Sequence, residues 1–158
     1  MNILVVYFSI TGNTRKIARM ASDRLHADLL ELRTVKDYPD DGDVLLSLGK
    51  REVESGFMPK LKSIAANIKN YDTILVGTPV WWGTMAPAVK TFAASFSWVG
   101  KKVYPFTTNG GKVGQISADF KKVFSGATVF RPLHVKFDER ILKSKLDSIT
   151  KWIEGFRA

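Results

Sequence analysis

The chain has 158 residues, of which 45% are hydrophobic and 25% charged, the size and composition of one globular domain. It contains no cysteine, which excludes thiol nucleophiles, disulfides and cysteine-ligated metal sites, so redox chemistry would need a bound organic cofactor. The net charge of +9 is concentrated in residues 60–158, which carry 16 Lys and Arg against 6 Asp and Glu. Because these basic residues occur singly or in pairs, they favour an acidic protein partner or an anionic small molecule and disfavour nucleic acid.

The sequence begins Met-Asn-Ile-Leu, without a basic leader, and no apolar run is long enough to span a bilayer. We therefore expect a cytoplasmic protein that does not contact a membrane. The two histidines, His26 and His134, are far apart in sequence, and each is expected on a helix surface or a strand face. The pattern indicates neither a metal site nor a catalytic acid or base.

Apolar runs and helical stripes alternate from the N-terminus. The run 3–8 predicts a buried parallel strand, because such strands are covered on both faces and read as continuous apolar segments. Residues 15–27 place their apolar side chains on one face of a helix, and a second strand is expected at 29–32.

The region 34–70 has a weaker pattern. The segment Tyr38-Pro39-Asp40-Asp41-Gly42 is typical of a turn, and residues 43–51 predict a helix. A loop at 55–59 is expected to lead into a second helix.

The second half of the chain continues the alternation. Strands are expected at 73–77, 103–108 and 128–135, and helices at 87–96, 113–123 and 141–156. Pro132 cannot donate to a ladder, so the last strand is predicted to be broken or at an edge. Five strands alternating with helices predict a single three-layer α/β domain over residues 1–158, with helices on both faces of the sheet.

The loop after the first strand reads Ser-Ile-Thr-Gly-Asn-Thr over residues 9–14. A loop between a parallel strand and a helix can direct hydroxyl and N–H groups at an anion, over the positive end of that helix. The same residue types also suit an ordinary turn and helix cap. Three hydroxyls and a glycine exceed the needs of one cap, so the loop is predicted to bind phosphate.

Two further segments complete a pattern with the first. Residues 77–85 read Gly-Thr-Pro-Val-Trp-Trp-Gly-Thr-Met, and residues 106–111 read Phe-Thr-Thr-Asn-Gly-Gly. Together with 8–14, they resemble the three FMN-binding loops of flavodoxins, most closely a branch with Trp-Trp-Gly in the second loop. The resemblance implies a flavodoxin-like, doubly wound, five-stranded parallel sheet of order 2-1-3-4-5 that binds FMN at its carboxyl edge.

The resemblance also implies a role for each loop. The first binds the phosphate, the second packs against the flavin rings, and the third binds the pyrimidine edge. Consecutive residues of an extended backbone point to opposite sides, so one tryptophan covers the flavin, and alignment favours Trp82. The implied FMN-binding residues are Ser9, Ile10, Thr11, Gly12, Asn13, Thr14, Thr78, Pro79, Val80, Trp81, Trp82, Gly83, Thr108, Asn109, Gly110 and Gly111.

The chain departs from the family pattern in two ways. Many flavodoxins are acidic, whereas this chain is basic, and its third loop lacks the aromatic residue that often covers the second flavin face. That face is therefore open, or a side chain from 34–59 covers it. These features leave three functions: an electron carrier that docks on acidic redox proteins, an FMN-dependent NAD(P)H:quinone-type oxidoreductase, and an FMN-free binding module. The absence of a Gly-x-Gly-x-x-Gly fingerprint and of an acid or base residue favours the carrier.

Overall fold

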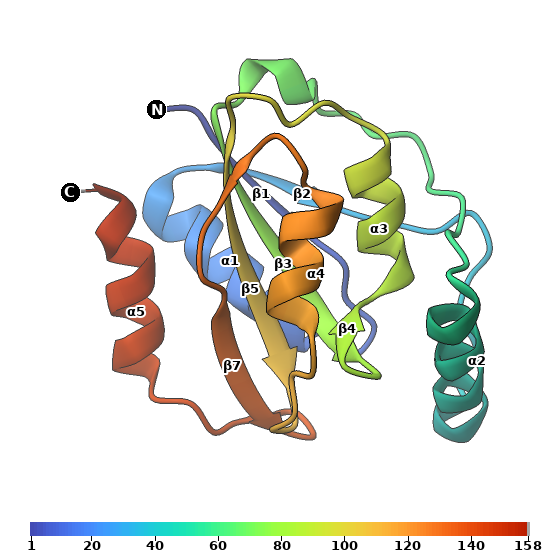
Figure 1. Ribbon diagram of the computed structural model, residues 1–158. Coiled ribbons are helices and arrows are strands. Elements are labelled where there is room, and N and C mark those ends of the chain that lie inside the picture. The colour runs from blue at the N-terminus through green and yellow to red at the C-terminus, as the bar shows by residue number, and fades with distance from the viewer. Residues whose placement is uncertain (158) are drawn as a thin grey trace.

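The computed structural model describes residues 1–157 and contains one sheet between two helical layers (Figure 1). Its five longer strands are parallel and lie in the order β2-β1-β3-β5-β7, which confirms the order predicted from the sequence. Three two-residue strands join them, of which β4 and β8 are antiparallel to β3 and β7. The bounds are β1 Ile3–Tyr7, β2 Asp28–Glu31, β3 Thr73–Trp81, β4 Thr84–Met85, β5 Lys102–Asn109, β6 Thr128–Val129, β7 Leu133–Asp138 and β8 Ile141–Leu142.

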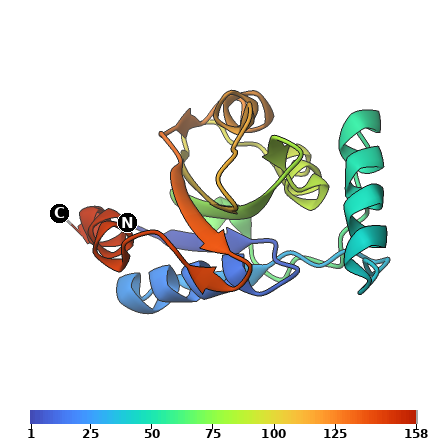
Figure 2. The same cartoon turned by 90° about the horizontal axis from the view of Figure 1, so that it is seen from below.

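Four helices cover the two faces of the sheet, as predicted (Figure 2). On one face lie α1 (Asn13–Leu25) and α5 (Leu146–Glu154), and on the other α3 (Pro87–Ala94) and α4 (Ile116–Val123). Each face has its own apolar core, because alternate residues of the strands point to opposite sides. None of these helices, nor any other in the described part of the chain, is long and apolar enough to cross a membrane.

The helix α2 (Gly42–Ser55) stands beside these layers rather than within one (Figures 1 and 2). The Asp41 carboxylate accepts hydrogen bonds from the N–H groups of Asp43 and Val44 at its start, and Gly56 ends it in a left-handed conformation with φ of 69°. The helix is longer than the predicted 43–51. Because only Gly49 and Glu52 are fully buried, α2 is attached to the rest of the molecule along a narrow stripe.

The prediction of a second helix after residue 59 is wrong. The chain there is extended, and only a single turn of 3-10 helix, η1 (Ile68–Asn70), precedes β3. The backbone pairs instead with residues 33–35: Val35 donates to the carbonyl of Lys60, and Lys62 donates to that of Arg33. These long-range hydrogen bonds replace the local bonds of a helix, and the local apolar spacing does not reveal them.

In the C-terminal region one prediction is confirmed and another is wrong. The predicted strand 128–135 is indeed broken, into β6 and β7 on either side of Phe130–Pro132. Ile141 and Leu142, however, do not belong to the closing helix. They form β8, because Glu139 turns the chain back with φ of 53° and Ser144 then bonds to Lys136.

Candidate functional site

The three predicted loops leave adjacent strands at one edge of the sheet. The strands β1, β3 and β5 are parallel neighbours, so their carboxyl ends lie together. The loop 9–14 follows β1, the segment 78–83 ends β3, and residues 108–111 end β5. A buried hydrogen bond of 2.7 Å between the hydroxyl groups of Thr14 and Thr108 links the first of these segments to the third. This edge is therefore the candidate site.

The first segment has an open backbone at the start of α1. Gly12 has a φ of 97°, and no atom lies within 4 Å of the place where a Cβ would stand. The Ser9 hydroxyl accepts a hydrogen bond of 3.1 Å from the Gly12 N–H, and the Asn13 amide donates to the carbonyl of Glu139. The N-cap residue, Gly12, has no side chain, and within the described residues the one side-chain hydrogen bond to an N–H of the first turn is the 3.5 Å contact of the Asn13 N–H with the Thr11 hydroxyl. Its N–H groups and positive end face the loop, the arrangement that binds anions.

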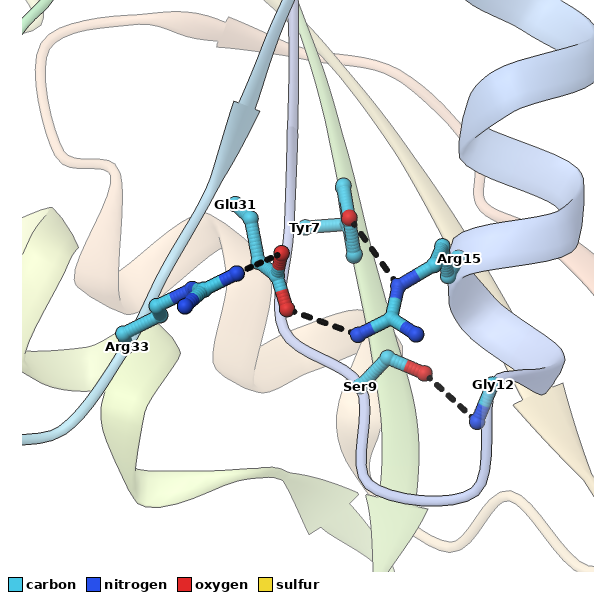
Figure 3. A network of polar contacts seen from close by, with 6 residues as sticks. All are labelled: Tyr7, Ser9, Gly12, Arg15, Glu31 and Arg33. Atoms are coloured by element: carbon cyan, nitrogen blue, oxygen red, sulfur yellow. Dashed lines mark hydrogen bonds and ion pairs between the residues drawn. The ribbon is translucent and has the colours of Figure 1, made fainter. Parts of the chain in front are cut away.

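Polar and charged residues beside this loop form a linear network (Figure 3). Arg15 donates to the Tyr7 hydroxyl at 3.3 Å and to the Glu31 carboxylate at 2.8 Å, and Arg33 pairs with the other Glu31 oxygen at 3.2 Å. Burial disfavours the ionised form of Glu31, but the hydrogen bonds from the two arginines outweigh it and lower its pKa. Arg15 is thus held within the network by its ion pair with Glu31.

A cavity of about 700 Å³ opens between this network and the loop. Ser9, Ile10 and Thr11 line one side, and Gly42 and Leu45 of α2 line another. A second cavity, of about 340 Å³, shares Gly42 and Leu45 and continues to the tryptophans at the end of β3. The two cavities together form a groove that runs from the first loop to the second.

The second segment is a strand and a tight turn rather than a loop. Residues 78–81, expected outside the strand, continue β3, which then turns back into β4 through Trp82 and Gly83. These two residues have φ values of 51° and 81°. The buried Thr78 hydroxyl accepts from the Ala86 N–H at 3.0 Å and holds the base of this hairpin. The pairing of Val80 and Trp81 with β4 keeps the end of this segment in a regular strand.

The two tryptophans have different environments. Trp81 packs edge-on against Phe8 and Tyr38, with ring centroids 5.9 Å and 5.2 Å away. The side chain of Trp82 is at the turn and half exposed, with Lys50 of α2 5.4 Å from its ring centre. Trp82 thus offers a flat apolar surface, while Trp81 belongs to the core.

The turn of the second segment rests on the start of α4. The Gly83 carbonyl accepts a hydrogen bond of 2.8 Å from the N–H of Gln115. A Cβ on Gly114 would lie 2.6 Å from that same carbonyl oxygen, so glycine is required there. Nearby, the Thr84 hydroxyl donates to the Asp119 carboxylate at 2.6 Å. Sequence reasoning missed Gly114, Gln115 and Asp119, and the only available signal was the glycine before α4.

The third segment presents backbone at its tip. The Asn109 side chain accepts from the Gly111 N–H at 2.8 Å, and Gly110 has open space around its Cα. Behind the tip, the Thr107 hydroxyl lies 2.8 Å from Nδ1 of His134 on β7. Burial, with a smaller effect from Arg131, lowers the pKa of His134. His134 therefore supports β5 from the strand face where it was expected.

A family model described as flavodoxin matches residues 2–156 of the chain. The chain belongs to the flavodoxin family. The match extends over both helical layers and all three segments of the candidate site, so family membership applies to the described domain from β1 to α5.

Solved flavodoxin-like structures agree with this assignment. A putative flavoprotein from Bacteroides eggerthii DSM 20697 is 28% identical, with a TM-score of 0.81 over 99% of this chain and 98% of the other. A flavoprotein from Lactobacillus acidophilus NCFM, solved in complex with FMN, is 23% identical, with a TM-score of 0.74 over 84% of this chain and 92% of the other. The flavodoxin fold is thus shared over nearly the full length.

One curated relative of this family member carries an enzyme name. An NAD(P)H dehydrogenase (quinone) from Syntrophus aciditrophicus (strain SB) is 28% identical over 125 residues, which make up 72% of this chain and 61% of the relative. The aligned part of the chain thus spans about three fifths of the length of that relative.

Proposed function

We propose that this flavodoxin-family protein binds FMN across the carboxyl ends of β1, β3 and β5 and carries electrons between redox partners. The observation that supports the proposal best is the meeting of the three predicted segments at one edge, with the first joined to the third by the Thr14–Thr108 hydrogen bond. The switch point of a doubly wound sheet is where such a fold binds its ligand.

The residues present fit each part of FMN. The hydroxyls of Ser9 and Thr11 and the N-terminus of α1 suit the phosphate, which neutral donors can surround without a bound cation. The half-exposed indole of Trp82 suits a flat, largely apolar ring system. The backbone at 109–111 suits the polar edge of the flavin. When bound, FMN would supply one-electron and two-electron transfer chemistry.

The protein would hold the ring system in place through contacts made before the ligand arrives. The Gly83 carbonyl is bonded to Gln115, and Thr84 is bonded to Asp119, so the turn at Trp82 is supported from α4. The Thr78–Ala86 bond fixes the other end of the hairpin. These bonds orient the face that Trp82 presents, and they exclude water from the base of the hairpin.

The charge of the chain supports acidic redox proteins as partners. The excess of Lys and Arg lies in residues 60–158, which include β5 and the third segment. Complementary charge accelerates the encounter of two proteins and orients them. Of these cations, Lys112 directly follows the third segment and Arg140 lines the larger cavity, so an acidic donor or acceptor would approach the edge where the flavin is proposed to bind.

A second candidate function is the oxidation of NAD(P)H with a quinone as acceptor. The name of the curated relative favours it. So does the third segment, Asn109–Gly111, which offers no aromatic side chain to cover the second face of the flavin. In this case the protein would position a nicotinamide and then a quinone over an open flavin face.

The absorption spectrum and redox titration of the purified protein test these candidates. The carrier predicts one FMN per chain, two separate one-electron reductions, and no oxidation of NADH or NADPH when a quinone is added. Steady turnover of NAD(P)H with a quinone would contradict the carrier and support the enzyme. A colourless protein that takes up no FMN would contradict both and favour the FMN-free binding module.

A further inference from the structure

A third cavity lies on the other side of α2 from the groove. It has a volume of about 510 Å³, within the range of small-molecule sites. Leu48 and Glu52 of α2 line one wall, and Phe57 and Pro59 line another. Asp37 and Tyr38 line both this cavity and the larger part of the groove, so the two spaces are neighbours. The sequence analysis did not predict this cavity, and the three FMN segments do not line it.

The inner end of the cavity holds a carboxylate. Glu52 is only 8% exposed, and its Oε1 accepts a hydrogen bond of 2.7 Å from the Tyr38 hydroxyl. Burial, together with this hydrogen bond, raises the pKa of Tyr38, so the tyrosine stays protonated and remains the donor. Among residues 1–156, no Lys, Arg or His nitrogen lies within 4 Å of the Glu52 carboxylate.

A carboxylate has about four acceptor positions, and Tyr38 uses one of them. The only side-chain hydrogen bond to the Glu52 carboxylate within the described chain is that from Tyr38, so its Oε2 is free to accept from a ligand. Among the described residues no buried side-chain oxygen lacks a hydrogen-bond partner, so Oε2 is open to the cavity, where a neutral O–H or N–H donor would replace water.

The mouth of the cavity has the opposite charge. Lys36, Arg51 and Lys60 line it and are exposed, against a single exposed carboxylate, Asp37. A cationic ligand would be repelled here, while a ligand with an anionic end would be attracted. Between the mouth and Glu52 the walls are largely apolar, with the Phe57 ring and Pro59 on one side and Leu48 on the other.

We propose that this cavity binds a hydroxylated aromatic acid, whose hydroxyl donates to Glu52 and whose acid group pairs with the cations at the mouth. The aromatic ring lies between Phe57 and Leu48, where it replaces water in contact with apolar side chains. The site is separate from the FMN site and does not depend on bound flavin. Trp81, which packs against Tyr38, reports its occupancy by fluorescence.

Calorimetric titration of the purified protein with three probes tests this proposal. The probes are 4-hydroxybenzoate, benzoate, which lacks the hydroxyl, and 4-hydroxybenzyl alcohol, which lacks the acid. We expect 4-hydroxybenzoate to bind about tenfold or more tightly than either other probe, because a hydrogen bond to a charged group is lost in one case and an ion pair in the other. Equal affinity for 4-hydroxybenzoate and benzoate, or no binding of any probe at millimolar concentration, would overturn the proposal.

A pair of variants locates the site. Glu52→Gln should remove the tenfold advantage of 4-hydroxybenzoate over benzoate, while Glu54→Gln, the same change at an exposed position of α2, should leave it intact. If both variants or neither lose the advantage, the assignment to Glu52 is wrong. Should Glu52→Gln fail to fold, Phe57→Ala at a half-exposed wall residue serves instead, and it should weaken all ring-containing probes.

Competition with FMN separates this proposal from the proposed function. Saturation with FMN should leave the affinity for 4-hydroxybenzoate unchanged, because none of the three FMN segments lines this cavity. Displacement of the probe by FMN would show that the cavity belongs to the flavin site and would overturn the proposal. If the protein binds the probe but not FMN, the proposed function is contradicted and the proposal of this site is supported.

Discussion

The hydroxyl oxygens of Thr14 and Thr108 lie 2.7 Å apart in a buried contact that joins the start of α1 to the end of β5. The residues are 94 positions apart in sequence. Thr108→Val removes one partner and leaves the Thr14 hydroxyl buried without it, which costs about 1–3 kcal/mol. We expect the free energy of unfolding to fall by this amount, and FMN affinity to fall with it. Urea unfolding and fluorescence titration measure the two effects.

Thr128→Val, on the exposed strand β6, is the matched control and should change neither quantity. A Thr14→Val, Thr108→Val double variant should be less destabilised than the sum of the single variants, because the second substitution removes the unpaired hydroxyl. Additive effects of the two substitutions would mean that the contact does not couple the segments.

The second prediction concerns the contact of Gly83 with Gly114. Gly114→Ala places a Cβ 2.6 Å from the Gly83 carbonyl oxygen, so the turn at Trp82 and the start of α4 must move apart. We expect a loss of stability of about 1–3 kcal/mol and weaker FMN binding, since the surface of Trp82 shifts. Gly100→Ala separates this clash from backbone strain, because Gly100 has a similarly positive φ of 77° with no atom within 4 Å. If both variants lose stability equally and keep FMN affinity, the contact does not support the site.

The third prediction follows from the pKa of Glu31, which its two arginine partners lower below the ordinary value of 4.5. The unfolded chain then binds a proton at Glu31 more readily than the folded chain does. The stability that Glu31 contributes is therefore fully present above about pH 4.5 and is lost as the pH falls through the pKa of the folded state. Glu31→Gln should reduce stability near neutral pH by about 0.5–1 kcal/mol, after allowance for partial exposure. The difference between variant and parent should shrink in acid, as denaturation at several pH values will measure. A difference that stays constant with pH would contradict the ion-pair network.

The fourth prediction concerns Lys112, which follows the third segment and is exposed. Reduction of a bound flavin adds negative charge, and a nearby cation stabilises it. Lys112→Glu should lower the two-electron midpoint potential by about 20 mV or more at low salt, and slow electron exchange with an acidic protein. Lys69→Glu, at the amino end of β3, is the control and should have little effect on the potential. A midpoint potential that does not change in Lys112→Glu would mean that the excess positive charge lies away from the flavin.

The sequence predicts the sheet and its edge because the signals are local. The run 3–8 followed by hydroxyl residues indicates a strand that leads into an anion-binding loop, and repetition of such a boundary at 77–78 and 106–109 indicates a shared edge. Trp81 and Trp82 differ because Trp81 ends β3, whereas Trp82 lies in the turn after it with φ of 51°. Local signals predicted the strands and the polar segments, and the resemblance to flavodoxins implied the strand order.

Pairings between distant residues could not be predicted. The contact of Gly83 with Gly114 depends on where α4 begins in space, and the Tyr38–Glu52 bond depends on how α2 attaches beside the sheet. The apolar pair Ile141 and Leu142 suits a helix by spacing, yet the turn at Glu139 directs it onto β7. In each case the tertiary contact, rather than the local pattern, decides the structure.

A comparison of the dissociation constants of FMN and riboflavin tests whether residues 9–14 bind the phosphate of FMN, because the two ligands differ only in that phosphate. If the first segment binds that phosphate through Ser9, Thr11 and the N-terminus of α1, two or more charge-assisted hydrogen bonds are lost with riboflavin. We expect FMN to bind about a hundredfold or more tightly than riboflavin. Equal dissociation constants for the two ligands would contradict the assignment of residues 9–14 as a phosphate site and, with it, the proposed orientation of the cofactor.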